Sequence, residues 1–241
     1  MAYSARLRLA GALLAMAALL AGCAQPLKKQ AFNREAAKHI NTVVLTRAEN
    51  QEEYQAFMLG HPGMGFGLIG GLVAAADMQS KTNKLTAAVN PKEVRLQERF
   101  SEKLKESLAK VGYQAAVVVL PKDTKEDQAL AAAKAKASAD AVLYVELYGG
   151  YWAAGPASDY FPRMAAKVRT FDAKTEKVLY EDTITYGYAM PQAQTVHLAS
   201  DPSYRFANID VLVADPARTR QGLYMGIDAL AEQIVADLRK N

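Results

Sequence analysis

The chain has 241 residues, 51% of them hydrophobic, and a formal net charge of +4 at pH 7. This length and composition suffice for one domain with a proper core. The small positive charge does not favour a nucleic-acid partner, which a strongly basic surface would indicate.

An apolar leader opens the chain and ends at Cys23, the only cysteine. Its charges are Arg6 and Arg8, and residues 19–23 read Leu-Leu-Ala-Gly-Cys. A positive start, an apolar stretch and small residues before the cleavage site are typical of an export signal. The pattern resembles the lipobox of bacterial lipoproteins, which implies that residues 1–22 are a signal peptide and that a diacylglycerol acylates the Cys23 thiol. An uncleaved membrane helix is the alternative.

The residue after the cysteine is Ala24, where inner-membrane lipoproteins commonly carry aspartate. The resemblance therefore implies lipid anchoring in the outer membrane, on its periplasmic face. Acylation leaves no thiol for a disulfide, so packing alone must hold the fold. Residues 23–39, basic around Lys28 and Lys29, are predicted to form a lipid-anchored tether, and residues 40–241 a single periplasmic domain.

A β-branched segment at 40–46 predicts the first strand, and residues 47–55 are charged and loop-like. The Gly-rich apolar insert at 60–80 follows, with five glycines in GMGFGLIGGLVAAADM (63–78) and no charge before Asp77. Residues 65–70 match G-x-G-x-x-G, but a dinucleotide site needs a strand immediately before the motif, and His61-Pro62 interrupts it.

Three other interpretations of the insert remain open. It is too short to span a bilayer without tilting or thinning. It is predicted either to pack on the domain or a partner as a flexible loop with a short helix, or to insert in a membrane or mediate self-association through its small residues. Its candidate interaction residues are Phe66, Leu68 and Ile69, since so apolar a patch rarely stays bare in water.

Regular patterning begins at Asn90-Pro91, which predicts the cap of a helix that Gly112 closes, with Phe100, Leu104, Leu108 and Val111 on one face. Consecutive apolar residues then predict a buried strand at 113–120. An Ala-rich helix from Thr124 to about residue 137 precedes a second buried strand at 141–148. Two strand–helix–strand crossings of this length predict parallel pairing.

The second half predicts an antiparallel hairpin, with alternating strands at 164–171 and 177–188 around the turn 172–176. Asp215-Pro216 predicts the cap of a C-terminal helix. Its apolar stripe is Leu223, Ile227, Leu230, Ile234 and Leu238. The fold class is therefore α/β, a two- or three-layer mixed sheet with parallel βαβ crossings, an added antiparallel hairpin and a C-terminal helix.

Aromatic residues concentrate in a predicted loop at 149–162 and just before it. They bury large areas at small entropic cost and so resemble an interface anchor, although a loop folded back on the sheet is equally consistent. The candidate interaction residues are Tyr148, Tyr151, Trp152, Tyr160 and Phe161.

Two segments, ADAVLYV at 139–145 and FDAKTEKVLY at 171–180, resemble the domain shared by the curli-export lipoprotein CsgG and the N-terminal part of TolB. The resemblance covers residues 90–188, implies the α/β fold and carries over no active-site residue. Glu176 stands where the turn glycine is usual. The long alternating segments of CsgG-type pores are missing, so pore formation is not implied.

The sequence gives little support for a catalytic or metal-binding function. His39, His61 and His197 match no metal-ligand spacing and are expected to be ordinary surface residues. The acidic residues Asp159, Asp172, Glu181 and Asp182 near the hairpin are expected to be solvated. No cofactor is expected.

The predicted function is a non-enzymatic assembly, adaptor or envelope-maintenance factor, held at the membrane by its N-terminal lipid and partnered by an envelope protein or by further copies of itself. The alternatives are an oligomeric, membrane-associated export component resembling CsgG and an enzyme acting on envelope polymers.

Overall fold

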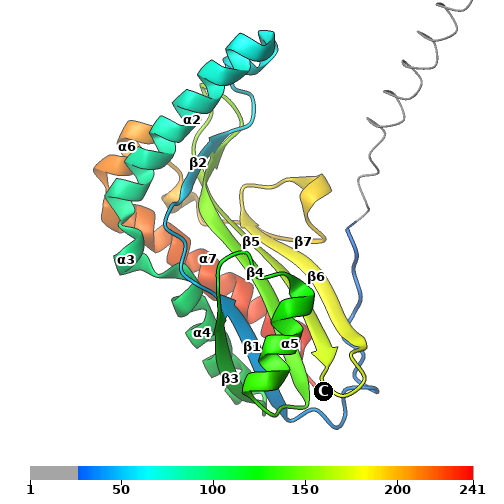
Figure 1. The fold of residues 1–241 in the computed structure, drawn as a ribbon. Helices are drawn as coiled ribbons and strands as arrows, with labels where there is room; N and C mark the ends of the chain where they lie inside the picture. Colours follow the sequence, from blue (N-terminus) through cyan, green and yellow to red (C-terminus); the bar gives the residue numbers. More distant parts are fainter. Residues whose placement is uncertain (1–26, 241) are drawn as a thin grey trace, which may run out of the picture.

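The computed structural model describes residues 27–240, so the leader and Cys23 lie outside the described residues. These residues form one seven-stranded mixed sheet with helices on both faces (Figure 1). The strand order is β3-β1-β4-β5-β6-β7, and β2 (Gln55–Met58) pairs with the far end of β4. This architecture confirms the predicted fold class.

The parallel part of the sheet places β1 (Thr42–Ala48) between β3 (Gln114–Leu120) and β4 (Ala141–Ala153). The crossing from β1 to β3 runs through α4 (Leu96–Lys110), and that from β3 to β4 runs through α5 (Glu126–Lys136). Both crossings were predicted. In the order β3-β1-β4 the two crossings run in opposite directions across the sheet, so α4 and α5 cover opposite faces.

The antiparallel part adds β5 (Phe161–Asp172) and β6 (Val178–Gly187) as the predicted hairpin, followed by the short β7 (Val196–Leu198) parallel to β6. Glu176 has φ 58° in the hairpin turn, the left-handed region that glycine adopts most easily. The Asp172 carboxylate stabilises this turn by accepting hydrogen bonds from the backbone N–H groups of Lys174 and Thr175.

The larger core lies between the sheet and α4, α7 (Pro216–Asp237), α2 (Gly67–Val89) and α6 (Ile209–Ala214). The whole predicted stripe of the C-terminal helix is buried there, and the Asp215 side chain caps α7 by accepting from the Arg218 N–H. A smaller core lies beneath α5 on the other face. Short 3-10 turns complete the connections at Pro62–Gly65, Pro191–Ala193 and Pro202–Tyr204.

Asp140, the residue before β4, links the start of β4 to the start of β1. Its carboxylate accepts hydrogen bonds of 2.8 Å from the backbone N–H groups of Asn41 and Thr42 and from the Thr42 hydroxyl. These hydrogen bonds, led by that from the Asn41 N–H, hold the pKa of Asp140 below its usual value. The acidic residue of the ADAVLYV segment therefore has a structural task.

Asn90 stands at the N-cap position predicted for it, before Pro91 and with Glu93 in the first turn, but its side chain makes no capping hydrogen bond. The insert and the following segment form α2, which continues to Val89, and Asn90 then takes φ 54°. Its side-chain amide donates to the Glu93 carboxylate instead of capping a helix. A second left-handed residue, Arg95 with φ 44°, separates α3 (Pro91–Val94) from α4, so the predicted single helix is two.

Two burial predictions are also wrong. The strand at 113–120 is an edge strand with alternating exposure, and Val119 is exposed. Asp172 and Asp182 are buried instead of solvated. Burial raises the pKa of Asp182, and Lys29 lies 3.4 Å from its carboxylate.

Part of the predicted tether packs on the domain. The backbone of Gln30 exchanges two hydrogen bonds with Glu181 of β6, in an antiparallel arrangement. Phe32 and Ala37 are buried in the larger core. Within the described residues, ordered packing therefore begins about ten residues before the predicted first strand.

Candidate functional site

The aromatic residues predicted to form one interaction loop separate into different surroundings. Strand β4 continues through Ala153, so residues 149–153 are strand rather than loop, and alternate side chains point to opposite faces. Tyr151 is 0% exposed and its hydroxyl donates to the Thr219 carbonyl, and Tyr160 is 3% exposed. Both belong to the core, and their prediction as interface residues is wrong.

Tyr148 and Trp152 lie on the opposite face of β4 from Tyr151. Helix α5 covers this face only as far as Val142 and Tyr144, which belong to the smaller core. Beyond the helix the face is uncovered, and Tyr148 is 58% exposed there. The structure thus leaves an aromatic sheet face open where the sequence predicted a loop.

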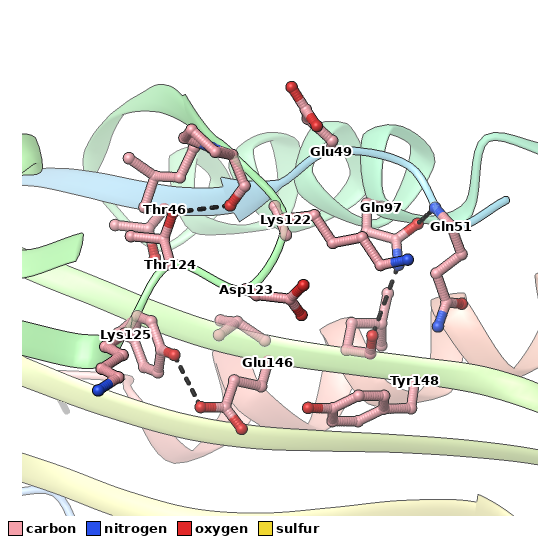
Figure 2. Close-up of a pocket in the computed structure, with 16 residues that line it drawn as sticks. Thr46, Glu49, Gln51, Gln97, Lys122, Asp123, Thr124, Lys125, Glu146 and Tyr148 are labelled. Atoms are coloured by element: carbon pink, nitrogen blue, oxygen red, sulfur yellow. Dashed lines mark hydrogen bonds between the residues drawn. The ribbon is translucent and has the colours of Figure 1, made fainter. Parts of the chain in front are cut away.

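Two adjoining hollows, of about 350 and 580 Å³, lie along this open face. Gln51, Lys122 and Tyr148 line both, so we name the pair the sheet groove. The first hollow lies at the carboxyl ends of β1 and β3, beside residues 144–148 of β4. The crossings from β1 and from β3 run in opposite directions across the sheet, and open α/β sheets usually bind ligands at such a point. Figure 2 shows the Tyr148 ring beside Glu146, with Asp123 and Lys122 on the loop opposite.

The polar groups of the first hollow carry mixed charge. Burial raises the pKa of the Tyr148 hydroxyl, with smaller contributions from the carboxylates of Glu146 and Asp123, so the hydroxyl stays protonated and can donate. Glu146 accepts a 2.7 Å hydrogen bond from the Tyr144 hydroxyl and lies 3.9 Å from the Lys167 ammonium. The Gln97 amide faces the same hollow and accepts from the Gln51 N–H at 3.1 Å.

Trp152 forms the aromatic end of the second hollow. Its ring lies 4.9 Å from Phe57 and 6.4 Å from Tyr188, measured between centroids, and the Arg163 guanidinium lies 5.4 Å from it. Arg163 is buried, which lowers its pKa, and it donates to the Tyr188 carbonyl at 2.5 Å. These contacts hold Trp152 in place as a half-buried wall of the groove.

Phe161 borders the same aromatic end, with its ring 6.0 Å from Tyr188 and the Arg205 guanidinium 4.7 Å from it. Phe57, Arg163 and Tyr188 were not predicted as site residues. Only the period-two spacing of Tyr148 and Trp152 within one strand could have indicated a shared face, and the predicted end of β4 at residue 148 concealed it.

A second candidate surface is formed by residues 64–76, which we name the α2 tip. It comprises the end of the 3-10 turn Pro62–Gly65, Phe66 and the N-terminal part of α2. Phe66, Leu68 and Ile69 are 78%, 82% and 79% exposed, and Met64, Leu72 and Val73 are also exposed. Figure 1 shows this end of α2 extending past the end of the sheet. The prediction of a flexible loop with a short helix is wrong, because the segment begins a 23-residue helix.

The glycines of the α2 tip have different tasks. A Cβ on Gly70 would lie 2.2 Å from the Gly63 carbonyl oxygen, so these two backbones approach closely. Gly67 has φ +61°, whereas Gly65 and Gly71 have no neighbours within 4 Å of an added Cβ. The match to G-x-G-x-x-G is therefore explained by a tight 3-10 turn and a helix start at a solvent-exposed tip.

A cluster of ionisable residues marks the base of the α2 tip. The Asp77 carboxylate lies 3.0 Å from His61 Nε2 and 2.5 Å from Lys81 Nζ. The hydrogen bond from Lys81 contributes most to holding the pKa of Asp77 below its usual value. His61 also accepts from the Gly63 N–H, so this histidine stabilises the entry to the tip.

Across residues 27–240, no group of three or more His, Cys, Asp or Glu side chains is placed to hold a metal ion. Within the same range, no helix combines the length and the apolar character needed to cross a membrane. His39 lies 3.1 Å from the Asp172 carboxylate, and His197 lies 3.4 Å from the Thr185 hydroxyl. These contacts are local and structural.

No family model and no curated protein matches the chain. Solved structures that align with it include a minor lipoprotein from Acinetobacter baumannii, 15% identical over 77% of this chain and 93% of that one, with a TM-score of 0.37. The hypothetical protein CT253 from Chlamydia trachomatis is 10% identical over 84% and 99%, with a TM-score of 0.38. A PelC dodecamer from Paraburkholderia phytofirmans is 11% identical over 88% and 95%, with a TM-score of 0.33. At these values no functional inference follows, and the resemblance to CsgG and TolB stays a prediction.

Proposed function

We propose that this protein is a lipid-anchored lipoprotein on the periplasmic face of the outer membrane, acting without catalysis as an assembly, adaptor or envelope-maintenance factor. The Leu-Ala-Gly-Cys pattern at residues 20–23, followed by Ala24, supports the anchor and its location. The sheet groove supports the binding role and is the observation that carries it.

The sheet groove has the properties of a protein-binding surface. Tyr148 and Trp152 present rigid rings along an uncovered sheet face, and aromatic rings are enriched among residues that dominate binding energies. Acidic, basic and uncharged amide side chains surround them, which suits the polar rim of an interface. An envelope protein that inserts an apolar or aromatic side chain between the two rings is the partner we propose.

The anchor is tested by Cys23→Ser. A hydroxyl does not form the thioether of a lipoprotein, so we expect the variant to lose labelled fatty acid and to leave the outer-membrane fraction, while the unchanged chain keeps both. Metabolic labelling and membrane fractionation measure the two properties. A Cys23→Ser protein that still incorporates label and fractionates with the outer membrane would show that the lipobox interpretation is wrong.

The binding role is tested by placing a photo-crosslinking phenylalanine analogue at Tyr148 in the acylated protein in cells. We expect a discrete adduct with an envelope protein, because the exposed ring faces the groove. The matched control is the same analogue at Lys105, an exposed position of α4 on the helix-covered side. Identical adduct patterns at the two positions, or none at Tyr148, would argue against the groove as the partner site.

A further inference from the structure

We infer that the α2 tip is a second membrane contact, which enters one leaflet of the membrane that holds the acylated Cys23. The inference rests on the lipid anchor of the proposed function. It assigns the exposed apolar residues of the tip to a lipid surface, and it leaves the sheet groove to a protein partner.

The first support is the distribution of polarity along the outward face of α2. In the first part this face presents Leu68, Ile69, Leu72 and Val73, and the two small residues Ala75 and Ala76 follow. About one turn later the same face becomes polar, with Gln79, Ser80, Asn83 and Lys84. The inward face of the helix is buried throughout, at Gly70, Ala74, Thr82, Leu85 and Val89. The exposed apolar side chains are therefore confined to the first part of the outward face.

The second support is the length of the α2 tip compared with the thickness of one membrane leaflet. The ten residues from Gly67 to Ala76 rise about 15 Å, which equals half of the roughly 30 Å hydrocarbon core. The tip is therefore long enough for one leaflet and too short for two. Its apolar part ends at the cluster of His61, Asp77 and Lys81, whose charges belong at the headgroup level.

The third support is the direction of the N-terminal chain. The bridge between Gln30 and Glu181 is antiparallel, so residues 27–29 run toward Gly187, and this is the end of the sheet from which α2 projects. Gln30 is level with Glu181, Arg169 and Tyr144, whereas the base of the tip is level with Ala154, where the Gly60 N–H donates. These levels are ten residues apart on β4, or about 33 Å.

The seven residues from Gln30 back to Cys23 reach about 25 Å when extended. Three strand spacings separate Gln30 from β4 and one more separates β4 from β2, so the two contacts lie about 19 Å apart across the sheet. Tilting the strands by about 25° from the membrane normal then brings Cys23 and the base of the α2 tip to the same membrane surface. The tip would give the domain a second membrane contact beside the acylated cysteine and so fix its orientation.

The test uses the mature-length chain, residues 23–241, with Cys23→Ser. This chain contains every described element and has no other thiol. A polarity-sensitive fluorophore is attached at Leu72→Cys and, as the matched control, at Gln79→Cys, two turns further along the exposed face. With vesicles of phosphatidylethanolamine and phosphatidylglycerol, we expect a blue shift and quenching by acyl-chain spin labels at position 72 and neither at position 79.

A second pair of variants uses the same vesicles. Changing Leu68 and Ile69 together to serine is expected to weaken vesicle co-sedimentation by roughly tenfold or more, since each side chain loses its burial in lipid. The control changes Val119 of β3 and Val211 of α6, two exposed apolar residues outside the tip, to serine. This control is expected to bind the vesicles as strongly as the unchanged chain. Because all four positions are exposed, thermal midpoints should stay equal.

Two results would overturn the inference. In the first, the emission of the label at position 72 does not change when vesicles are added. In the second, the emission shifts with protein concentration in the absence of vesicles, which would mean that a second copy of the chain covers the tip. The proteins in these vesicle experiments carry no lipid. A failure here is therefore distinguishable from a failure of acylation at Cys23 or of crosslinking at Tyr148.

Discussion

Replacing Leu230 with alanine is expected to lower the free energy of unfolding by about 2 to 5 kcal/mol. Leu230 is 0% exposed and lies in the middle of the α7 stripe, in the core that α7 and α4 share with the sheet. Truncation removes apolar contacts and leaves a cavity that the surrounding elements fill only in part. The midpoint of urea unfolding measures the change when the slope of the unfolding free energy against urea concentration is the same for both proteins.

The matched control for this variant is Glu232→Ala, on the exposed side of the same helix. Alanine keeps the helix propensity there, so the free energy of unfolding is expected to change by less than about 0.5 kcal/mol. Equal midpoints for the two variants would mean that α7 does not pack on the sheet through this stripe.

Gly187→Ala is expected to destabilise the protein by about 3 to 5 kcal/mol, because two penalties combine. Gly187 has φ +89°, a conformation that strains any residue with a Cβ. A Cβ there would lie 1.7 Å from the Pro162 carbonyl oxygen, a backbone atom that cannot rotate away. The free energy of unfolding from chemical denaturation measures the loss.

Gly71→Ala is the natural comparison. Gly71 lies within α2, and an added Cβ meets no atom within 4 Å. Alanine at an unobstructed helix position is expected to be neutral or to stabilise by up to about 1 kcal/mol. If Gly187→Ala were as well tolerated as Gly71→Ala, the tight approach of β6 to the start of β5 would not exist in solution.

Local patterns in the sequence were sufficient for much of the fold. The spacing of Leu223, Ile227 and Leu230 predicted which face of α7 is buried, because helical periodicity is a property of consecutive residues. Gly112 was correctly predicted to end α4, since its φ of +91° is a conformation that glycine adopts without strain. The strand–helix–strand lengths likewise predicted the parallel pairing of β1, β3 and β4.

The candidate site was less predictable, because it depends on which faces other elements cover. The glycines and prolines around 149–162 were interpreted as a loop, yet pairing with β2 and β5 extends β4 through Gly149 and Gly150 to Ala153. That extension sent Tyr151 into the core and Trp152 to the groove. The prediction of a solvated Asp182 failed for a similar reason, since the N-terminal residues that cover it belong to a distant part of the sequence.

The sequence by itself determined the parallel pairing of the central strands and the buried face of α7, and it carries the proposed acylation signal at Cys23. Each of these depends on residues a few positions apart, whose spacing is already present in the unfolded chain. The tertiary structure alone decided that α2 is a long helix with an uncovered apolar tip and that Tyr148 lines an open groove. Exposure is a relation between elements distant in sequence, so it exists only once α5 has covered part of the sheet face and left the rest uncovered.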